Sequence, residues 1–130
     1  MKKTYTPLRY PGGKNKLTKQ FEVICRKNNI STFIEPYAGG AGISLYLLLN
    51  NIVENIILND LDPLIYSFWY SIVNYNQEFI NMIENTDISI DNWYKFKDII
   101  NNHSEYDILT VGFAAFFLNR TNRSGILKGG

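Results

Sequence analysis

At 130 residues, with 45% hydrophobic and 15% aromatic residues, the chain has enough apolar material for the core of one domain, or of part of one, and its composition excludes a disordered protein. No apolar run reaches the roughly 18 residues of a membrane span, and residues 1–5 lack an apolar signal region, so we expect a cytoplasmic protein without a membrane anchor. The single cysteine, Cys25, excludes an internal disulfide and a cysteine-based zinc site, and no metal site is predicted.

The formal net charge of +1 conceals a partition of charge along the chain. Residues 1–30 contain eight lysines and arginines and one acid, whereas residues 31–94 contain eight acids and no lysine or arginine. Residues 95–130 contain five basic residues and three acids, and after Asp107 the remaining charges are all positive. An acidic middle favours a cationic small molecule, and basic ends favour a polyanion.

The N-terminal half predicts alternating helices and strands. Two prolines and the turn signal Gly12-Gly13 make residues 4–13 extended or turn-like. Apolar residues at helical spacing, Cys25 among them as a buried small hydrophobe, predict a helix over residues 16–28. The elements predicted next are a short buried strand over 32–35, a glycine loop, a well-covered apolar helix over 43–50, and a strand over 55–59 of the continuous apolar type found in parallel sheets.

The C-terminal half predicts helices only. Pro63 suits the first turn of a helix that runs to about residue 75, and a short amphipathic turn follows around Phe79. Asp91 is expected to be the N-cap of a helix through about residue 102. A last helix is predicted over 108–119, before a polar, glycine-punctuated and basic tail. The fold class is therefore α/β.

The glycine loop and the turn after the second strand form a candidate ligand site. A parallel strand pair requires a right-handed crossover, which places loop 38–42 and turn 59–62 at the same edge of the sheet. Ligands bind at such carboxyl ends, where glycines let the backbone approach them closely. An acid after the second strand can accept hydrogen bonds from two ribose hydroxyls. Asp60, 18 positions beyond Gly42, is the predicted residue, and Asp62 is the alternative.

The residues of the loop favour S-adenosylmethionine over a dinucleotide. Leu45 takes the place of the third glycine of the dinucleotide fingerprint, which disfavours an NAD-type dehydrogenase. Glu35 stands at the loop entrance with no basic residue nearby in the sequence, so it would repel a phosphate and attract an ammonium or sulfonium. Tyr37 offers a cation–π face to the sulfonium, or is a core or rim tyrosine.

Gly12-Gly13-Lys14 invites a second interpretation, as a phosphate-binding P-loop. The P-loop pattern needs a further glycine five residues before the last one, and Ser or Thr after the lysine. Leu8 and Asn15 occupy these two places, so a P-loop is excluded.

Four motifs follow one another along the chain and are specific in combination. They are Arg9-Tyr10-Pro11-Gly12-Gly13-Lys14, Phe33-Ile34-Glu35-Pro36-Tyr37-Ala38-Gly39-Gly40-Ala41-Gly42, Asn59-Asp60-Leu61-Asp62 and Phe117-Leu118-Asn119-Arg120-Thr121. The set resembles the Dam-type (D12 class) DNA adenine-N6 methyltransferases across the whole chain. This resemblance implies the N-terminal part of a Rossmann-like, S-adenosylmethionine-dependent methyltransferase sheet in residues 1–76. It implies a helical insertion that leads into the DNA-recognition region, incomplete at the C-terminus, in residues 77–130.

The resemblance also implies roles for single residues. Tyr10 and Lys14 match a motif that packs against S-adenosylmethionine, and Asp60 matches the ribose-binding acid. The site of the methionine moiety is matched by Glu35, Ala38, Gly39, Gly40 and Gly42, and Tyr37 is a predicted cofactor residue because of its ring. The region that contacts double-stranded DNA is matched by Asn119, Arg120, Asn122, Arg123 and Lys128. Arginine suits phosphates or guanine edges and asparagine suits adenine, and a solvated loop is the alternative.

The family's catalytic motif, of the D-P-P-Y type, is absent from this chain. In the family its acid and a backbone carbonyl accept the amine protons of a flipped adenine while its aromatic ring stacks on the base. None of the four prolines is adjacent to another, so no catalytic residue is predicted here. We expect a truncated methyltransferase that is neither active nor robustly stable alone. The alternative is a non-catalytic S-adenosylmethionine- or DNA-binding module that pairs with a complementary C-terminal half.

Overall fold

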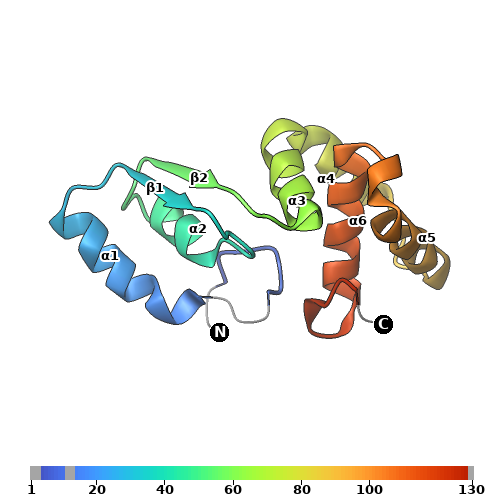
Figure 1. The fold of residues 1–130 in the computed structure, drawn as a ribbon, viewed down its shortest axis with the longest axis horizontal. Coiled ribbons are helices and arrows are strands. Elements are labelled where there is room, and N and C mark those ends of the chain that lie inside the picture. The colour runs from blue at the N-terminus through green and yellow to red at the C-terminus, as the bar shows by residue number, and fades with distance from the viewer. Residues whose placement is uncertain (1–3, 11–13, 129–130) are drawn as a thin grey trace. The chain divides into compact units, whose positions relative to one another are not determined.

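The computed structural model describes residues 4–10 and 14–128 as an α/β structure in which helices predominate. It divides into two compact units, Met1–Asp60 and Leu61–Gly130, which can be followed by colour in Figure 1. The boundary expected after residue 76 falls inside the second unit, where helices from both sides of it pack together. The turn expected at Gly12-Gly13 lies outside the described residues.

The first unit contains a parallel pair of strands, β1 (Thr32–Glu35) and β2 (Asn55–Leu58). Both strands predicted from the sequence are thereby confirmed, β2 ending one residue before its predicted end. Phe33 lies opposite Ile56, and Ile34 opposite Ile57. Because side chains alternate along a strand, the first pair faces one side of the sheet and the second pair faces the other.

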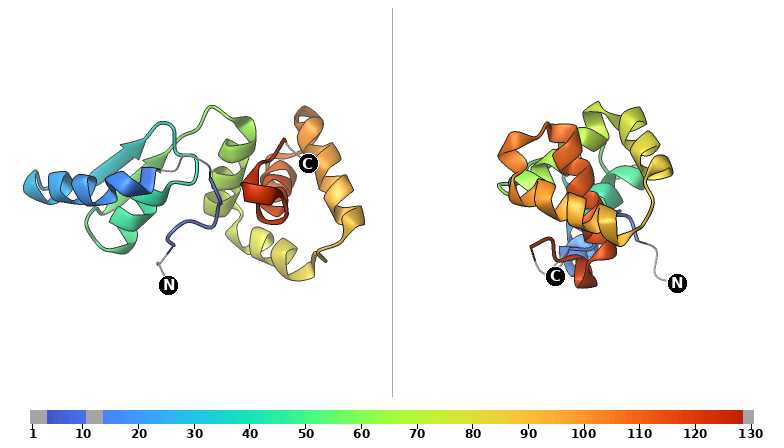
Figure 2. Two further views of the ribbon diagram at one scale, coloured as in Figure 1. Left: turned by 90° about the horizontal axis from the view of Figure 1, so that it is seen from below. Right: turned by 90° about the vertical axis from the view of Figure 1, so that its right-hand side faces the viewer.

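Two helices cover one side of this sheet, α1 (Thr18–Lys27), which follows the short helix η1 (Lys14–Leu17), and α2 (Gly42–Leu49). Figures 1 and 2 show both on the same side of the strands. Their core residues are Cys25, Ile43, Leu47 and Val53, against which the partly buried Phe33 and Ile56 pack. The expected burial of Cys25 is confirmed, and burial raises the pKa of its thiol.

A polar network on the surface of the first unit links α1 to α2. The Tyr46 hydroxyl donates to Glu22 Oε2 over 2.7 Å, and Lys19 Nζ donates to the same carboxylate oxygen over 3.0 Å. Hydrogen bonds from Tyr46 and then Lys19 lower the pKa of Glu22 to about 2. Hydrogen bonds to Tyr46 and then Glu22 raise the pKa of Lys19 to about 12.

The other side of the sheet exposes apolar residues. Ile34 and Ile57 are 59% and 52% exposed, so the prediction of a buried strand over 32–35 is wrong for this face. Leu49, at the end of α2, is 62% exposed, so the expectation that this apolar helix is covered nearly all round is also wrong.

The second unit consists of helices. They are α3 (Pro63–Asn74), α4 (Asn76–Asn85), α5 (Ile90–Asn101), the short η2 (His103–Glu105), α6 (Ile108–Thr121) and the short η3 (Arg123–Gly125). Pro63 begins α3 as predicted, after the Asp62 side chain, which caps the helix by accepting from Leu64 N over 2.9 Å.

Three predictions in this unit need correction. The turn expected around Phe79 is a ten-residue helix, α4, because Phe79 is buried in the aromatic core and anchors it. Ser89, not Asp91, is the N-cap of α5, and its hydroxyl accepts from Asn92 N over 3.2 Å. Finally, α6 continues to Thr121, past its predicted end at residue 119.

An aromatic core holds the second unit together. Phe68 is fully buried and contacts Trp69, Phe79 and Phe116, with ring centroids 4.8, 5.7 and 5.8 Å away. Close approach of α3 and α6 depends on Gly112, where an added Cβ would lie 2.5 Å from the Ser67 carbonyl oxygen. The helices therefore meet with backbone against backbone at this point.

Candidate functional site

Backbone hydrogen bonds tie the glycine loop to the turn that follows β2. Asn59 N donates to Glu35 O over 3.1 Å, and Ala38 N donates to Asn59 O over 2.9 Å. The Asn59 side chain adds a bond from Nδ2 to Pro36 O over 3.2 Å. The loop and the turn therefore lie together at one edge of the sheet, as the crossover argument predicts.

Asp60 supports the loop directly. Its Oδ2 accepts from Gly39 N over 2.8 Å, and Gly39 has φ of +49°, a conformation that favours glycine. A Cβ added at Gly39 would lie 2.8 Å from the Tyr10 ring, so the ring rests on the loop backbone. Asp60 itself does not line the cavity described next.

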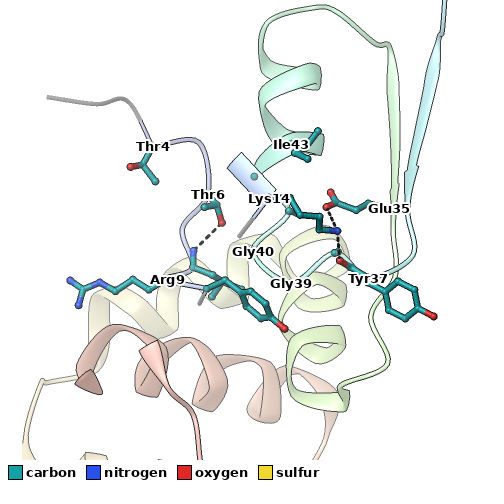
Figure 3. A pocket seen from close by; sticks show the side chains of 14 residues that line it. Thr4, Thr6, Arg9, Lys14, Glu35, Tyr37, Gly39, Gly40 and Ile43 are labelled. Carbon is teal, nitrogen blue, oxygen red and sulfur yellow. Dashed lines mark hydrogen bonds and ion pairs between the residues drawn. The ribbon is translucent and has the colours of Figure 1, made fainter. Parts of the chain in front are cut away.

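A cavity of about 260 Å³ lies between the N-terminal segment and the loop (Figure 3). Of the predicted cofactor residues, those that line it are Tyr10, Lys14, Glu35, Tyr37, Ala38, Gly39, Gly40 and Gly42. Every one of these belongs to the first unit. The structure thus brings together eight of the nine cofactor residues that the sequence singled out, Asp60 being the exception.

Glu35 is the buried charge of this cavity, with 5% of the residue exposed. Lys14 Nζ lies 3.0 Å from Glu35 Oε1 and donates to the Tyr37 carbonyl oxygen over 2.9 Å, as Figure 3 shows. On the other side, Ser44 Oγ donates to Glu35 Oε2 over 2.5 Å. A buried carboxylate is stable only when its oxygens are paired in this way.

This ion pair corrects the prediction that no basic residue lies near the loop. Lys14 is distant in sequence, and packing of the N-terminal segment across the loop brings its ammonium to Glu35. Sequence reasoning did not single out Ser44, although a lone serine among the apolar residues of α2 was a visible signal. The Tyr37 ring is 72% exposed and points away from the ion pair in Figure 3.

A second group of predicted residues lies where α6 ends. Asn119 and Asn122 are buried, with 2% and 7% of each residue exposed. Asn119 Nδ2 donates to Gly125 O over 3.2 Å, and Asn122 Nδ2 donates to Ile126 O over 2.8 Å. Both amides therefore hold the turn after α6, in which Ser124 and Gly125 adopt positive φ of 57° and 72°.

The indole of Trp93 on α5 completes this turn. Its Nε1 donates to Asn122 Oδ1 over 2.6 Å, and Lys97 Nζ lies 4.6 Å from the ring centroid. The three predicted cations, Arg120, Arg123 and Lys128, have exposed side chains. Of the five residues predicted to face DNA, the structure thus presents three cations to solvent and uses two amides internally.

A comparison of the sequence with models of known protein families identifies the family of this chain. Residues 10–128 match the family model described as D12 class N6 adenine-specific DNA methyltransferase. The chain belongs to this family. The resemblance drawn from the four motifs is therefore confirmed.

The D12-class chain is similar to one curated methyltransferase. It is 27% identical over 135 residues to "Type II methyltransferase M.MjaIII" of Methanocaldococcus jannaschii. The match covers 93% of this chain and 47% of the relative, so the D12-class chain spans about half of that protein's length. No solved structure is significantly similar to it. Within residues 4–10 and 14–128, no helix is long and apolar enough to cross a membrane, and no cluster of acidic, His or Cys residues resembles a metal site.

Proposed function

We propose that this chain is the cofactor-binding part, with the first DNA-facing turn, of a site-specific DNA methyltransferase. The proposed reaction transfers a methyl group from S-adenosylmethionine to adenine N6 in duplex DNA. Membership of the D12 class supports the reaction type. The observation that carries the cofactor assignment is the buried Glu35 carboxylate, which already accepts an ammonium group at the end of β1.

The cavity fits the amino-acid end of S-adenosylmethionine. Lys14 Nζ, held by Glu35 Oε1 and the Tyr37 carbonyl, stands where an α-ammonium would find two acceptors. Added Cβ atoms at Gly39 and Gly40 would meet the Tyr10 side chain at 2.8 and 3.1 Å, so glycine at both positions lets this side chain pack against the loop that lines the cavity. A cavity of about 260 Å³ lies below the roughly 300–1,000 Å³ of drug-sized ligand pockets. It therefore suits one end of the cofactor.

When bound, the cofactor would supply an activated methyl group on its sulfonium. Glu35 would hold its ammonium, and Asp60 remains our candidate for its ribose, since the fixed loop places this carboxylate beside Gly39. A Rossmann-like sheet larger than β1 and β2 is part of the proposal. The D-P-P-Y type motif is not among these 130 residues, so we expect no methylation by this polypeptide alone.

Calorimetric titration of the purified chain tests the cofactor assignment. S-adenosylmethionine and its demethylated product should bind, and NAD should not, because the buried Glu35 carboxylate repels phosphate and Leu45 takes the place of the third glycine of the dinucleotide fingerprint. Asp60→Ala should weaken binding, whereas Glu54→Ala, an exposed acid before β2, should not. Binding of NAD in preference to S-adenosylmethionine would refute the assignment.

The exposed cations in and around the turn after α6 support the proposed binding of DNA. Arg120, Arg123 and Lys128 can contact phosphates, and phosphate contacts weaken steeply with salt. Replacing Arg123 by Gln should weaken binding to a labelled duplex and reduce the salt slope by about one. Lys95→Gln on α5 is the control, because it also removes one positive charge but lies outside the turn. An equal effect of both variants would mean that the turn is a general basic surface.

A second candidate is a binding module that works with a separate chain carrying the D-P-P-Y motif. The open sheet face favours it, because Ile34 and Ile57 form an exposed apolar pair on a sheet covered on one side only. Co-expression with the part of the Methanocaldococcus jannaschii relative beyond its match to this chain should then yield a complex that methylates adenine. Ile57→Lys should abolish the complex, and Val73→Lys, at an exposed position of α3, should not.

A further inference from the structure

Ser44 on α2 is a buried polar side chain to which no role in the cofactor site has been assigned. It is completely buried, and its hydroxyl donates to Glu35 Oε2 over 2.5 Å. A serine inside a helix commonly donates back to the carbonyl of the preceding turn. In this helix, whose remaining residues are glycine and hydrophobic side chains, the hydroxyl is instead directed to the end of β1.

The two oxygens of Glu35 have different partners. Oε2 is held by Ser44, which does not line the cavity, and Oε1 is held by Lys14 Nζ, which does. The Ser44 bond fixes the carboxylate plane and thereby leaves Oε1 directed at the cavity. Beside Oε1, the Tyr37 carbonyl oxygen accepts from the same ammonium. Together these two oxygens form a two-acceptor site for a primary ammonium group.

Lys14 can leave this site more easily than Ser44 can. The lysine side chain is 45% exposed, so its ammonium can move into water, whereas the serine has no such route. A ligand ammonium of the same charge can then take the two acceptors without a change in the net charge of the site. The carboxylate remains in place throughout because Ser44 continues to hold its other oxygen.

Resting on the proposed function, we propose that Ser44 is a positioning residue for S-adenosylmethionine. Its hydroxyl fixes Glu35 so that Oε1 and the Tyr37 carbonyl bind the α-ammonium of the cofactor in exchange for Lys14. Ser44 makes no contact with the cofactor, and its effect is transmitted through the Glu35 carboxylate. The adenosine end of the cofactor is not influenced by this bond.

Calorimetry with two ligands tests this proposal on the 130-residue chain. For Ser44→Ala we expect a fall in affinity for S-adenosylmethionine of about tenfold, because the Glu35 side chain is then no longer held in advance and must be immobilised on binding. Affinity for 5′-methylthioadenosine, which lacks the amino-acid moiety, should be unchanged. Ser71→Ala removes another fully buried serine hydroxyl, in α3, and should leave both affinities unchanged.

Repeating the Ser44→Ala measurement in a Lys14→Met protein tests whether Ser44 acts through Glu35 or through Lys14. A fall in affinity on Ser44→Ala should remain there, because the hydroxyl acts on the carboxylate and not on the lysine, although its size will differ since both residues contact the same carboxylate. Disappearance of the effect in this background would overturn the proposal, as would equal losses for both ligands, which would indicate general damage to the loop. A wild-type chain that binds neither ligand would instead refute the proposed function itself.

Discussion

The two units of this chain are stabilised by different kinds of contact. The second unit is built on a dry aromatic core, in which Phe68 and Phe79 are buried and helices meet at a glycine. The first unit has a small apolar cluster on one face of two strands. The loop and the turn at the carboxyl ends of these strands are held by polar contacts to Glu35 and Asp60. The candidate chemistry lies in the less completely packed unit. Binding groups there are kept in place by hydrogen bonds rather than by tight packing, which leaves backbone and charge accessible to a ligand.

The largest effect that distinguishes the units should come from core truncation. Phe68→Ala removes a ring that contacts three others, and it should lower the free energy of unfolding of the second unit by about 3–5 kcal/mol. Leu47→Ala is the matched, fully buried change in the first unit and should have the smaller effect, because fewer large side chains surround it. Urea unfolding followed by hydrogen exchange measures both. Equal losses would remove the contrast between the cores.

Contact between helix backbones in the second unit is tested by Gly112→Ala. Alanine gains about 1 kcal/mol of helix propensity, but the added Cβ would stand 2.5 Å from Ser67 O and force α3 and α6 apart. We expect a net loss of about 1–2 kcal/mol in the free energy of unfolding. Ala115→Gly in the same helix is the reverse change at a buried position, and it reports the propensity term together with the loss of one buried methyl group. A stabilised Gly112→Ala protein would show that the helices can separate without loss.

The turn after α6 provides the next smaller effect. Trp93→Phe keeps a ring but removes the donor to Asn122 Oδ1, and should lower stability by about 1 kcal/mol. Because the turn presents Arg123, affinity for duplex DNA should fall as well. Tyr94→Phe, at an exposed neighbouring position, should change neither quantity. Unaltered exchange of the Gly125 and Ile126 amides in the Trp93 variant would contradict a structural role for the indole.

The smallest effect should be the pH dependence of the surface network in the first unit. Because the pKa of Glu22 is lowered from 4.5 to about 2, its stabilising contribution is present above pH 4.5 and is lost as the pH falls through about 2. The difference in Tm between wild type and Glu22→Gln should therefore shrink toward zero over this interval. A difference that stays constant down to pH 2 would mean that the carboxylate charge is unimportant to the network.

Local signals account for most of what the sequence predicted correctly. Pro63 and the apolar runs of β1 and β2 act over a few residues, and the structure places the elements where they indicate. The strand–loop–helix–strand pattern likewise brought the glycine loop and turn 59–62 to one sheet edge. These are the features for which chain-local chemistry is decisive.

What the sequence did not reveal depends on contacts between distant residues. The pairing of Lys14 with Glu35 requires the N-terminal segment to cross the loop, and no periodicity encodes that path. Asn119 and Asn122 were predicted to face DNA because the family resemblance implies it, but the turn carbonyls engage both amides and the Trp93 indole engages that of Asn122. Their direct contact with DNA stays a prediction that burial makes less favourable. Whether Ile34 is exposed depends on which elements pack against its side of the sheet, and the residues of the strand itself do not encode this.

The Trp93 hydrogen bond gives the protein an optical reporter of its basic turn. The sequence has two tryptophans, and Trp69 packs against the Phe68 ring with 8% of the residue exposed. Trp93 is half-buried, hydrogen-bonded to the turn and close to a lysine ammonium, so its emission is sensitive to the turn's hydration and charge. In a Trp69→Phe background, fluorescence of the remaining indole would therefore follow the arrival of a polyanion at Arg123 without any attached label.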